Sequence, residues 1–342
     1  MKSLKQLLWA GAAIAVLASC SAEEEYALDG AIRPGEEAIT ISSYIPGKRA
    51  VDKTTFAEGD VIGLYACQTA GAYANSFTAN FMNNVAVTKG ADAWTYSPMT
   101  AWPSDENEHL SFIAFYPQST KSTASALRYP FTVNSDVDQQ VDVLWCTIKD
   151  AHINDRNGTA INGNPDAAAF EAASGPINLQ FKHMLSKVTV QVKLADGHPG
   201  TTAKLKALSL NNANSSGDFA LNSTLSSASG GSWTSNTPTN FTLHTDTDEP
   251  KDIITTAETV ATMFMIPQDI TAYHTSLNVA YSYSLPDGTE KEVTEEIYLP
   301  NTWEINKAYN YVINIEPDIE MINISPSAVD WDSPAGNAGY QQ

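Results

Sequence analysis

Short runs of β-branched and aromatic residues, separated by turn-forming residues, constrain the fold of this chain more than any other feature. Runs such as Val61–Cys67, Leu110–Tyr116 and Val141–Ile148 are separated by clusters of Pro, Gly, Asn and Asp. Only Pro165–Ala173 has the composition of a short helix, and no other stretch keeps a long helical period. Many short strands at irregular spacing predict an all-β chain built from β-sandwiches.

One strand near the middle of the chain changes its inward face. Apolar residues of Leu179–Leu185 occupy odd positions, whereas those of Val188–Val192 occupy even positions. Either a β-bulge resets the register between the two runs, or the strand crosses there from one sheet to another. We place a domain boundary just before Gly175. This predicts one β-sandwich over residues 38–174 and a second over residues 175–317.

The N-terminal residues have the layout of a secretory signal. Two lysines precede an apolar run, Leu7–Leu17, which is too short for an ordinary membrane span. The sequence Leu17-Ala18-Ser19-Cys20 then resembles a lipobox, which implies that residues 1–19 are removed and that Cys20 carries lipid. The alternative is an ordinary cleaved signal whose cysteine is incidental.

Acidic residues follow Cys20 directly, in Ser21–Glu25. This arrangement resembles the export signal of surface lipoproteins, although a solvated acidic linker has the same composition. We interpret residues 20–37 as a flexible tether.

The charge of the chain excludes some classes of partner. It carries 39 acidic and 19 basic residues, for a formal net charge of −20. Such acidity opposes binding to nucleic acid and adsorption to anionic lipid, so we expect no nucleic-acid partner. Membrane attachment would then depend on the lipid at Cys20.

No motif for catalysis or metal binding is present in the sequence. The six histidines lack HExxH spacing, and neither a nucleophile elbow nor a phosphate-binding glycine loop occurs. Asp136, Asp138 and Asp142 lie close together but lack the Gly and Glu of an EF-hand. His183, in an apolar strand, is expected to be a hydrogen-bonded structural residue. We therefore predict no enzyme, no cofactor and no metal site.

The two remaining cysteines and three of the tryptophans each allow two interpretations. Cys67 and Cys146 lie in strand-like runs, so they are either two buried thiols or a disulfide. Trp94, Trp102 and Trp145 could line a sugar-binding site, but tryptophans on the strands of a sandwich more often belong to the core.

Several spaced motifs together resemble the fimbrillin family, the subunits of type V pili in Bacteroidota. In chain order they are the lipobox, Ile39-Thr40-Ile41, Arg49-Ala50, Phe56–Tyr65, Trp102-Pro103, Phe112–Pro117, Asp142–Trp145, Phe181–Val188, Met265–Gln268 and Trp303–Tyr311. The resemblance implies two tandem β-sandwich domains of the transthyretin-like, Greek-key type. It also implies a structural pilus subunit at the outer membrane that supports adhesion.

The resemblance further implies activation by proteolysis and polymerisation by strand exchange. A trypsin-like protease would cut after Arg49, with Arg33 as the alternative, and remove the strand that contains Ile39 and Ile41. A strand of another pilus subunit would fill the vacated groove, where main-chain hydrogen bonds give affinity and alternate side chains give specificity. The implied partners are other subunits, the protease, and outer-membrane lipid reached through Cys20.

The last apolar residues form a separate segment, residues 318–342, after Pro317. Ile322 and Ile324 alternate with polar residues, and Val329 and Trp331 follow. Such a segment has backbone groups that need a partner strand. It is either the donor strand for a neighbouring subunit or an ordinary edge strand of its own domain.

A monomeric surface lipoprotein that binds glycan is the alternative function. It fits the same signal sequence and β-rich composition, and exposed aromatic platforms would favour it.

Overall fold

The computed structural model describes residues 36–45, 55–105, 107–121, 125–154, 159–160, 175–225, 230–235, 237–245, 251–300, 302–317 and 321–331. In these residues β-strands dominate, and Val137–Gln139 forms a 3₁₀ turn. The predicted all-β fold is confirmed. No helix in this part of the chain is long and apolar enough to cross a membrane. The helix expected at Pro165–Ala173 lies outside the described residues.

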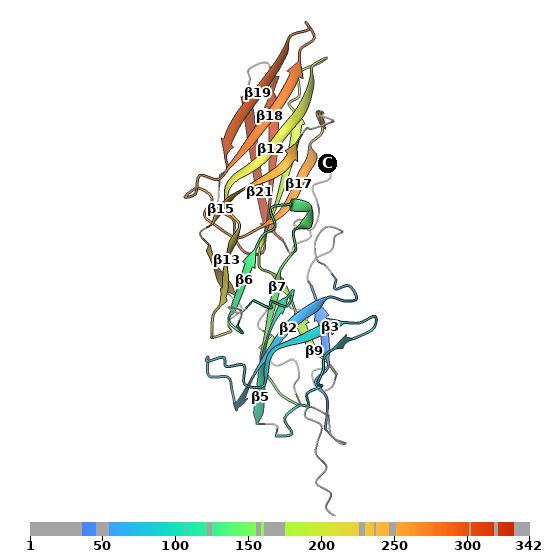
Figure 1. Cartoon of the computed structure of the whole chain (residues 1–342), viewed down its shortest axis with the longest axis vertical. Helices are drawn as coiled ribbons and strands as arrows, with labels where there is room; N and C mark the ends of the chain where they lie inside the picture. The colour runs from blue at the N-terminus through green and yellow to red at the C-terminus, as the bar shows by residue number, and fades with distance from the viewer. Residues whose placement is uncertain are drawn as a thin grey trace, which may run out of the picture.

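The molecule is elongated, and its N-terminal half contains a seven-stranded sheet (Figure 1). The sheet has the order β10-β7-β5-β2-β3-β4, with β8 on β7. Its strands are β2 (Val61–Ala70), β3 (Met82–Lys89), β4 (Trp94–Thr95), β5 (Glu108–Tyr116), β7 (Leu144–Ala151), β8 (Thr159–Ala160) and β10 (Lys182–His183).

Both faces of this sheet are buried. The neighbouring residues Leu64 and Tyr65 of β2 point to opposite faces, yet both are at most 2% exposed. They belong to two different hydrophobic clusters. A small parallel sheet, β1 (Ile41–Tyr44) with β9 (Ile177–Gln180), packs in the cluster on the Leu64 face.

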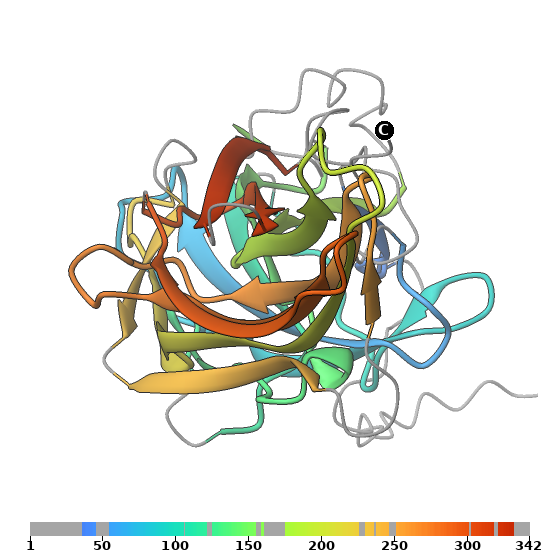
Figure 2. The same ribbon diagram turned by 90° about the horizontal axis from the view of Figure 1, so that it is seen from above.

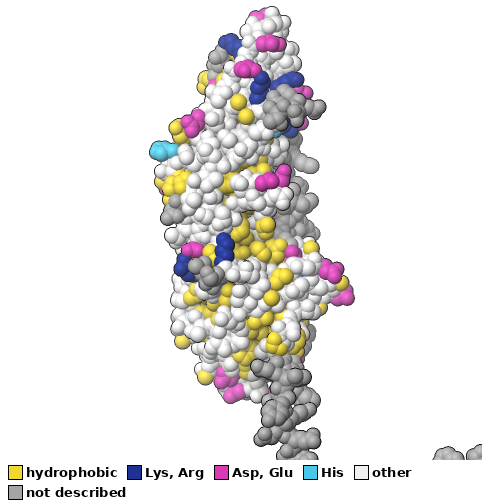
Figure 3. All heavy atoms as spheres, viewed as in Figure 1, with side chains coloured by type: hydrophobic (Ala, Val, Ile, Leu, Met, Phe, Trp, Pro, Cys, Tyr) yellow, Lys and Arg dark blue, Asp and Glu magenta, His cyan; other side chains and the backbone are white. Residues whose placement is uncertain are grey.

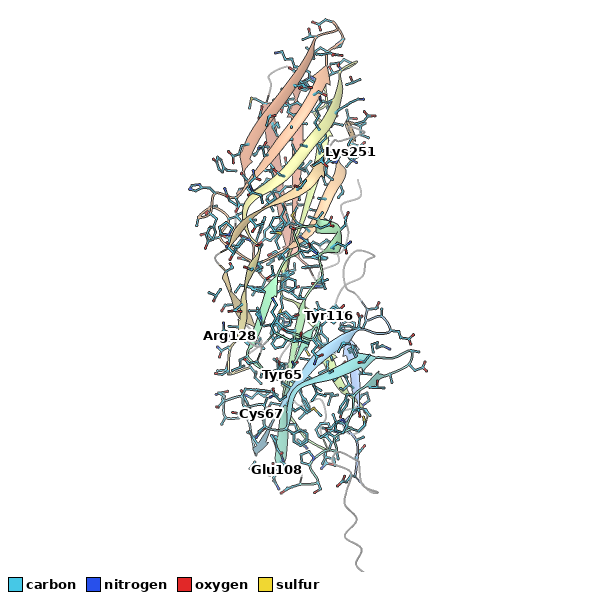
Figure 4. The ribbon with its side chains drawn as sticks, viewed as in Figure 1. Tyr65, Cys67, Glu108, Tyr116, Arg128 and Lys251 are labelled. Atoms are coloured by element: carbon cyan, nitrogen blue, oxygen red, sulfur yellow. The ribbon has the colours of Figure 1, made fainter. Side chains whose placement is uncertain are left out.

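A three-stranded sheet covers the Tyr65 face and joins the two halves. It has the order β14-β13-β6 and consists of β6 (Arg128–Thr132), β13 (Ser216–Leu221) and β14 (Gly231–Ser235). We call it the joining sheet. Its Phe219 is fully buried, 5.9 Å from the Trp145 ring of β7. Arg128 of β6, labelled in Figure 4, forms an ion pair with Asp218 of β13.

The C-terminal half is a sandwich of two sheets, seen as separate layers from above (Figure 2). One sheet has the order β17-β11-β20-β21, and the other has the order β15-β12-β18-β19 with β16 on β12. Their strands are β11 (Ser186–Leu194), β12 (Thr202–Asn214), β15 (Pro238–Thr245), β16 (Lys251–Ile253), β17 (Glu258–Met265), β18 (Ser276–Ser284), β19 (Glu290–Tyr298), β20 (Lys307–Glu316) and β21 (Met321–Asp330).

The change of inward face near Ser186 marks a crossing between sheets. β9 pairs with β1, β10 pairs with β7, and β11 belongs to the C-terminal half. The crossing alternative is therefore correct, and the chain changes halves between His183 and Ser186. Division into two tandem domains at Gly175 stays a prediction, because one hydrophobic cluster runs from β7 through the joining sheet into the C-terminal half.

Cys67 and Cys146 are buried free thiols. Cys67 shares a cluster with Tyr65, whereas Cys146 belongs to the cluster on the opposite face of the same sheet. The disulfide alternative is therefore wrong, since the sheet itself separates the two sulfur atoms.

The tryptophans that could have lined a sugar site are core residues. Trp94, Trp102 and Trp145 are 8%, 4% and 3% exposed. On the face shown in Figure 3, charged side chains are scattered rather than gathered in one patch, and hydrophobic side chains show mainly on the N-terminal half.

Candidate strand-exchange site

Residues 37–45 lie between two neighbouring segments of the N-terminal half. On one side β1 runs parallel to β9, in the register Ile41 to Ile177 through Tyr44 to Gln180. The backbone N–H groups of Ile177 and Phe181 donate to the carbonyls of Thr40 and Tyr44, each at 2.8 Å. We call the place that residues 37–45 fill the β1 site.

The other side of the β1 site is formed by residues 100–102. Ile39 N–H donates to the Thr100 carbonyl at 2.9 Å, and Trp102 N–H donates to the Glu37 carbonyl at 2.8 Å. The segment is thus hydrogen-bonded to residues 100–102 at its start and to β9 from Thr40 onward, and β1 itself pairs with β9 in a two-stranded sheet.

Alternate side chains of this segment point into the core. Ile39, Ile41 and Ile45 are 0%, 7% and 3% exposed, whereas Thr40 and Tyr44 are exposed. Period-two alternation is what a strand with one buried face requires. The prediction that Ile39 and Ile41 share an inward face is confirmed, although the strand itself begins only at Ile41.

Two side chains of the N-terminal half also depend on the segment. Trp94 Nε1 donates to Ser43 Oγ at 3.0 Å, and the Tyr96 hydroxyl donates to the Ile39 carbonyl at 2.9 Å. Burial raises the pKa of Tyr96, so its hydroxyl stays protonated as a donor. Both donors would lose these partners if residues 37–45 left.

The chain downstream of β1 is fixed again at Phe56. Its ring lies edge-on to those of Trp94, Tyr116 and Phe181, at centroid distances of 5.0, 5.3 and 5.1 Å. Phe181 directly follows β9, and Tyr116 ends β5 (Figure 4). Phe56 therefore packs against the core through these three rings. The predicted processing residues, Arg49 and Arg33, and the predicted lipidation residue, Cys20, lie outside the described residues.

The C-terminal segment forms an edge strand of its own half. β21 is antiparallel to β20 over its whole length, from Glu316 opposite Met321 to Lys307 opposite Asp330. Within this chain the segment has the arrangement of the edge-strand alternative, and its role as a donor to other subunits stays a prediction. Ile322, Ile324 and Val329 are half-buried, so the predicted alternation is present.

Trp331, directly after β21, is fully buried between two rings. Its indole stacks on His183 at a centroid distance of 3.9 Å and an interplanar angle of 4°, and on Phe264 at 5.5 Å and 17°. His183 is 1% exposed, and its Nδ1 lies 2.8 Å from Asp142 Oδ2. We call Trp331, His183 and Phe264 the Trp331 stack. The prediction that His183 is a hydrogen-bonded structural residue is confirmed, but nothing in the sequence indicated its aromatic partner.

The aspartates considered for a calcium loop have other roles. Asp136 accepts the Asp138 N–H at 3.1 Å and so begins the 3₁₀ turn, while Asp142 bonds to His183. Among the described residues, no group of three or more His, Cys, Asp or Glu side chains could hold a metal ion.

Comparisons with known proteins agree with this architecture. The chain is similar to the crystal structure of a fimbrial protein from Bacteroides vulgatus, with a TM-score of 0.55 and 18% identity over 85% of this chain and 99% of the other. It is also similar to a candidate cell adhesion protein from Bacteroides uniformis, with a TM-score of 0.52 and 16% identity over 87% of this chain and 98% of the other. At such identities the likeness establishes a shared fold. No curated protein sequence matches the chain.

A family profile described as fimbrillin-like matches residues 49–331, that is, from Arg49 to the Trp331 stack. Because this match covers most of the chain, the protein belongs to the fimbrillin-like family.

Proposed function

We propose that this protein is a structural subunit of a cell-surface pilus that polymerises by strand exchange and supports adhesion. Membership of the fimbrillin-like family and the fold shared with a fimbrial protein support a pilus-type subunit. The single observation that carries strand exchange is the β1 site, where a short N-terminal segment lies between two other segments and fills part of the core.

The energetics of the β1 site suit exchange of one strand for another. Burying an isoleucine contributes about 1.5–3 kcal/mol, so three such side chains amount to several kcal/mol that an empty site would lose. The backbone groups of β9 and residues 100–102 would also lack partners. A strand with alternating apolar side chains, supplied by another subunit, would restore both contributions.

Processing after Arg49 would separate β1 from the rest of the chain. Arg49 lies between Ile45 and Phe56, both of which pack in the same hydrophobic cluster. Cleavage there would leave Phe56 anchored while residues 37–45 kept only non-covalent contacts. Cleavage at Arg33, the alternative, would leave β1 attached to the chain.

β21 is the donor strand in this proposal. Its Ile322 and Ile324 repeat the spacing of Ile39 and Ile41, and as an edge strand it is hydrogen-bonded to β20 alone among the described strands. A neighbouring subunit would accept it beside β9.

Export as a lipoprotein through Cys20 would bring the subunit to the outer membrane. In a host that acylates lipoproteins, Cys20→Ala is expected to leave the protein out of the membrane fraction. Membrane partition of this variant equal to that of the wild type would contradict the lipid anchor.

The test of assembly is treatment of the folded protein with a trypsin-like protease, followed by N-terminal sequencing and electron microscopy. We expect a new N-terminus at Ala50 and filaments. The matched controls are Arg49→Gln and Arg33→Gln. Filaments from Arg49→Gln, or none from the cleaved wild type, would contradict the proposal.

A further inference from the structure

A single fully buried side chain lies at the end of β21. None of the ten residues of β21 is buried, and Ser325–Ala328 are all exposed. Trp331, the next residue, is fully buried in the Trp331 stack. Ile322, Ile324 and Val329 pack against the core only in part, so beside the backbone ladder with β20 the stack supplies the one fully buried side chain at this end of the described segment.

The stack is built on the segment where the chain crosses between halves. Trp331 N–H donates to the Asn306 carbonyl at 2.9 Å, and Asn306 N–H donates to the Leu185 carbonyl at 3.1 Å. His183, whose ring lies against the indole, is two residues before Leu185. Asp142 at 2.8 Å from the ring and the pairing of His183 with Leu144 fix its position against β7.

The same segment forms the wall of the β1 site. Phe181 N–H donates to Tyr44 of the β1 segment, and Phe181 lies two residues before His183. The only strand ladder that β9 makes in the described structure is with β1. If β1 leaves, β9 loses that ladder, and the constraint on the residues leading into His183 is reduced.

We propose that occupancy of the β1 site controls release of β21 from its own sheet. With β1 in place, the segment after β9 is constrained on the side leading into His183, while β7 and Asp142 hold the His183 ring itself, and the stack helps to retain β21. When β1 departs, the segment from β9 to His183 loosens, the stack weakens, and β21 becomes free to pair with another subunit. This inference rests on the proposed function for its purpose, since it would make processed subunits donors and keep unprocessed ones inactive. The physical coupling itself does not require assembly.

Coupling between two sites is reciprocal, which allows a test without any protease. In the full chain, Trp331→Ala is expected to speed amide hydrogen exchange in β21, and also in β1 and β9. Exchange at β1 and β9 should rise by between about five- and 150-fold, the usual range for coupled sites. Exchange in β18, which lies in the other sheet of the C-terminal half, should not change.

Asp330→Asn is the matched control. It removes the ion pair between Asp330 and Lys307, where the carboxylate oxygen lies 2.6 Å from Nζ, but leaves the indole in place. We expect unchanged exchange at β1 and β9. If Trp331→Ala does not fold, Trp331→Phe retains a ring of smaller area and should give the same pattern with a smaller change.

The reverse direction uses Ile39→Asp with Ile41→Asp, which places charges at buried positions and should displace β1. Exchange in β21 should then accelerate. The proposal is overturned if β21 is freed by Trp331→Ala without any change at β1 and β9, or if β1 is displaced without any change at β21. Filament formation is scored separately: filaments without coupled exchange would contradict this inference alone, and coupled exchange without filaments would contradict the proposed function alone.

Discussion

The side chain of Cys146 faces a core in which the thiolate form is disfavoured. Burial raises the pKa of this thiol, and Cys67 is buried against the opposite face of the same sheet. The thiolate is the reactive form of cysteine. Cys146 should therefore be inert in the folded protein, and Cys67 should be shielded from reagents because it is buried. The sequence alone left a disulfide open because it could not assign each cysteine to a face.

Thiol labelling checks this. In a Cys20→Ser variant, we expect no reaction of Cys67 or Cys146 with a thiol reagent under native conditions and reaction of both in guanidinium chloride. Labelling of only one residue in the denatured protein, or a non-reducible mass shift before denaturation, would contradict the assignment.

Burial of Cys146 and of several tyrosines also makes the folded protein less stable at alkaline pH. Because the folded-state pKa of Cys146 lies above its ordinary value of 9.0, the unfolded chain loses this proton first as the pH rises. The stabilisation that comes from keeping this thiol protonated in the folded protein is fully present below pH 9.0 and is lost as the pH rises above that value. Tyr129 and Tyr311, whose pKa values are raised by burial from 10.0, act in the same direction. The thermal unfolding temperature should be nearly constant around neutral pH and should fall above pH 9.0.

At the level of elements, the strands with strong local signals were predictable and the pairings between distant strands were not. Val61–Cys67 lies within β2, and Leu110–Tyr116 lies within β5. Residues 211–235, rich in Ser, Asn and Gly, have the composition of exposed hairpins and loops, and β13 and β14 do form a hairpin there. What the composition did not predict is that this hairpin belongs to the joining sheet and buries Phe219. The partner of β13 in that sheet, β6, is far away in sequence, so composition carried no signal for the pairing.

The same limit applies to the candidate site. The alternation of Ile39 with Ile41 predicted a strand with one buried face. Its parallel partner β9 and the closing segment at residues 100–102 are set by long-range contacts that one sequence does not reveal. The Trp331 stack was missed for the same reason, since His183 and Trp331 are distant in sequence.

The joining sheet offers a test at one glycine. A Cβ atom on Gly231 would lie 2.4 Å from Cζ of Phe219 and 2.8 Å from the Ala220 carbonyl oxygen. Gly231→Ala should therefore destabilise the protein by about 1–3 kcal/mol through overpacking. Ser232→Ala, at an exposed position of the same strand, is the control and should be nearly neutral. Denaturant unfolding measures both, and equal stability of the two variants would contradict the close packing.

Removal of residues 320–342 tests the two roles of β21. As a donor strand, β21 should be dispensable for folding, so the truncated chain should be a folded monomer that does not polymerise after cleavage. Size-exclusion chromatography of wild-type and truncated protein after protease treatment decides this. Equal assembly of the two would refute the donor role, whereas misfolding of the truncated chain would favour the edge-strand role alone.

At the scale of the whole molecule, the two halves share one hydrophobic cluster. It extends from Trp145 of β7 through Phe219 of the joining sheet to the core around Val188 and Tyr311. The Trp233 indole N–H of the joining sheet also donates to the Met184 carbonyl at 2.8 Å, at the crossing between halves. Neither half therefore has a complete hydrophobic core without the other.

We therefore expect the chain to unfold as one cooperative unit. Denaturant titrations followed by tryptophan fluorescence and by far-UV circular dichroism should give coincident single transitions. Two separated transitions, or probes that disagree, would indicate halves that fold independently.

The two-sided hydrogen bonding of the β1 site has a mechanical consequence. A segment that is bonded to residues 100–102 at its start and to β9 further on, if pulled along its own direction, stretches these hydrogen bonds together, because none can open before the segment slides. The same segment pulled sideways would open one bond at a time and detach under a much smaller force. A filament whose joints were loaded lengthwise in this way would resist tension by shear. Flow past the cell would then load these joints in the direction in which they are strongest.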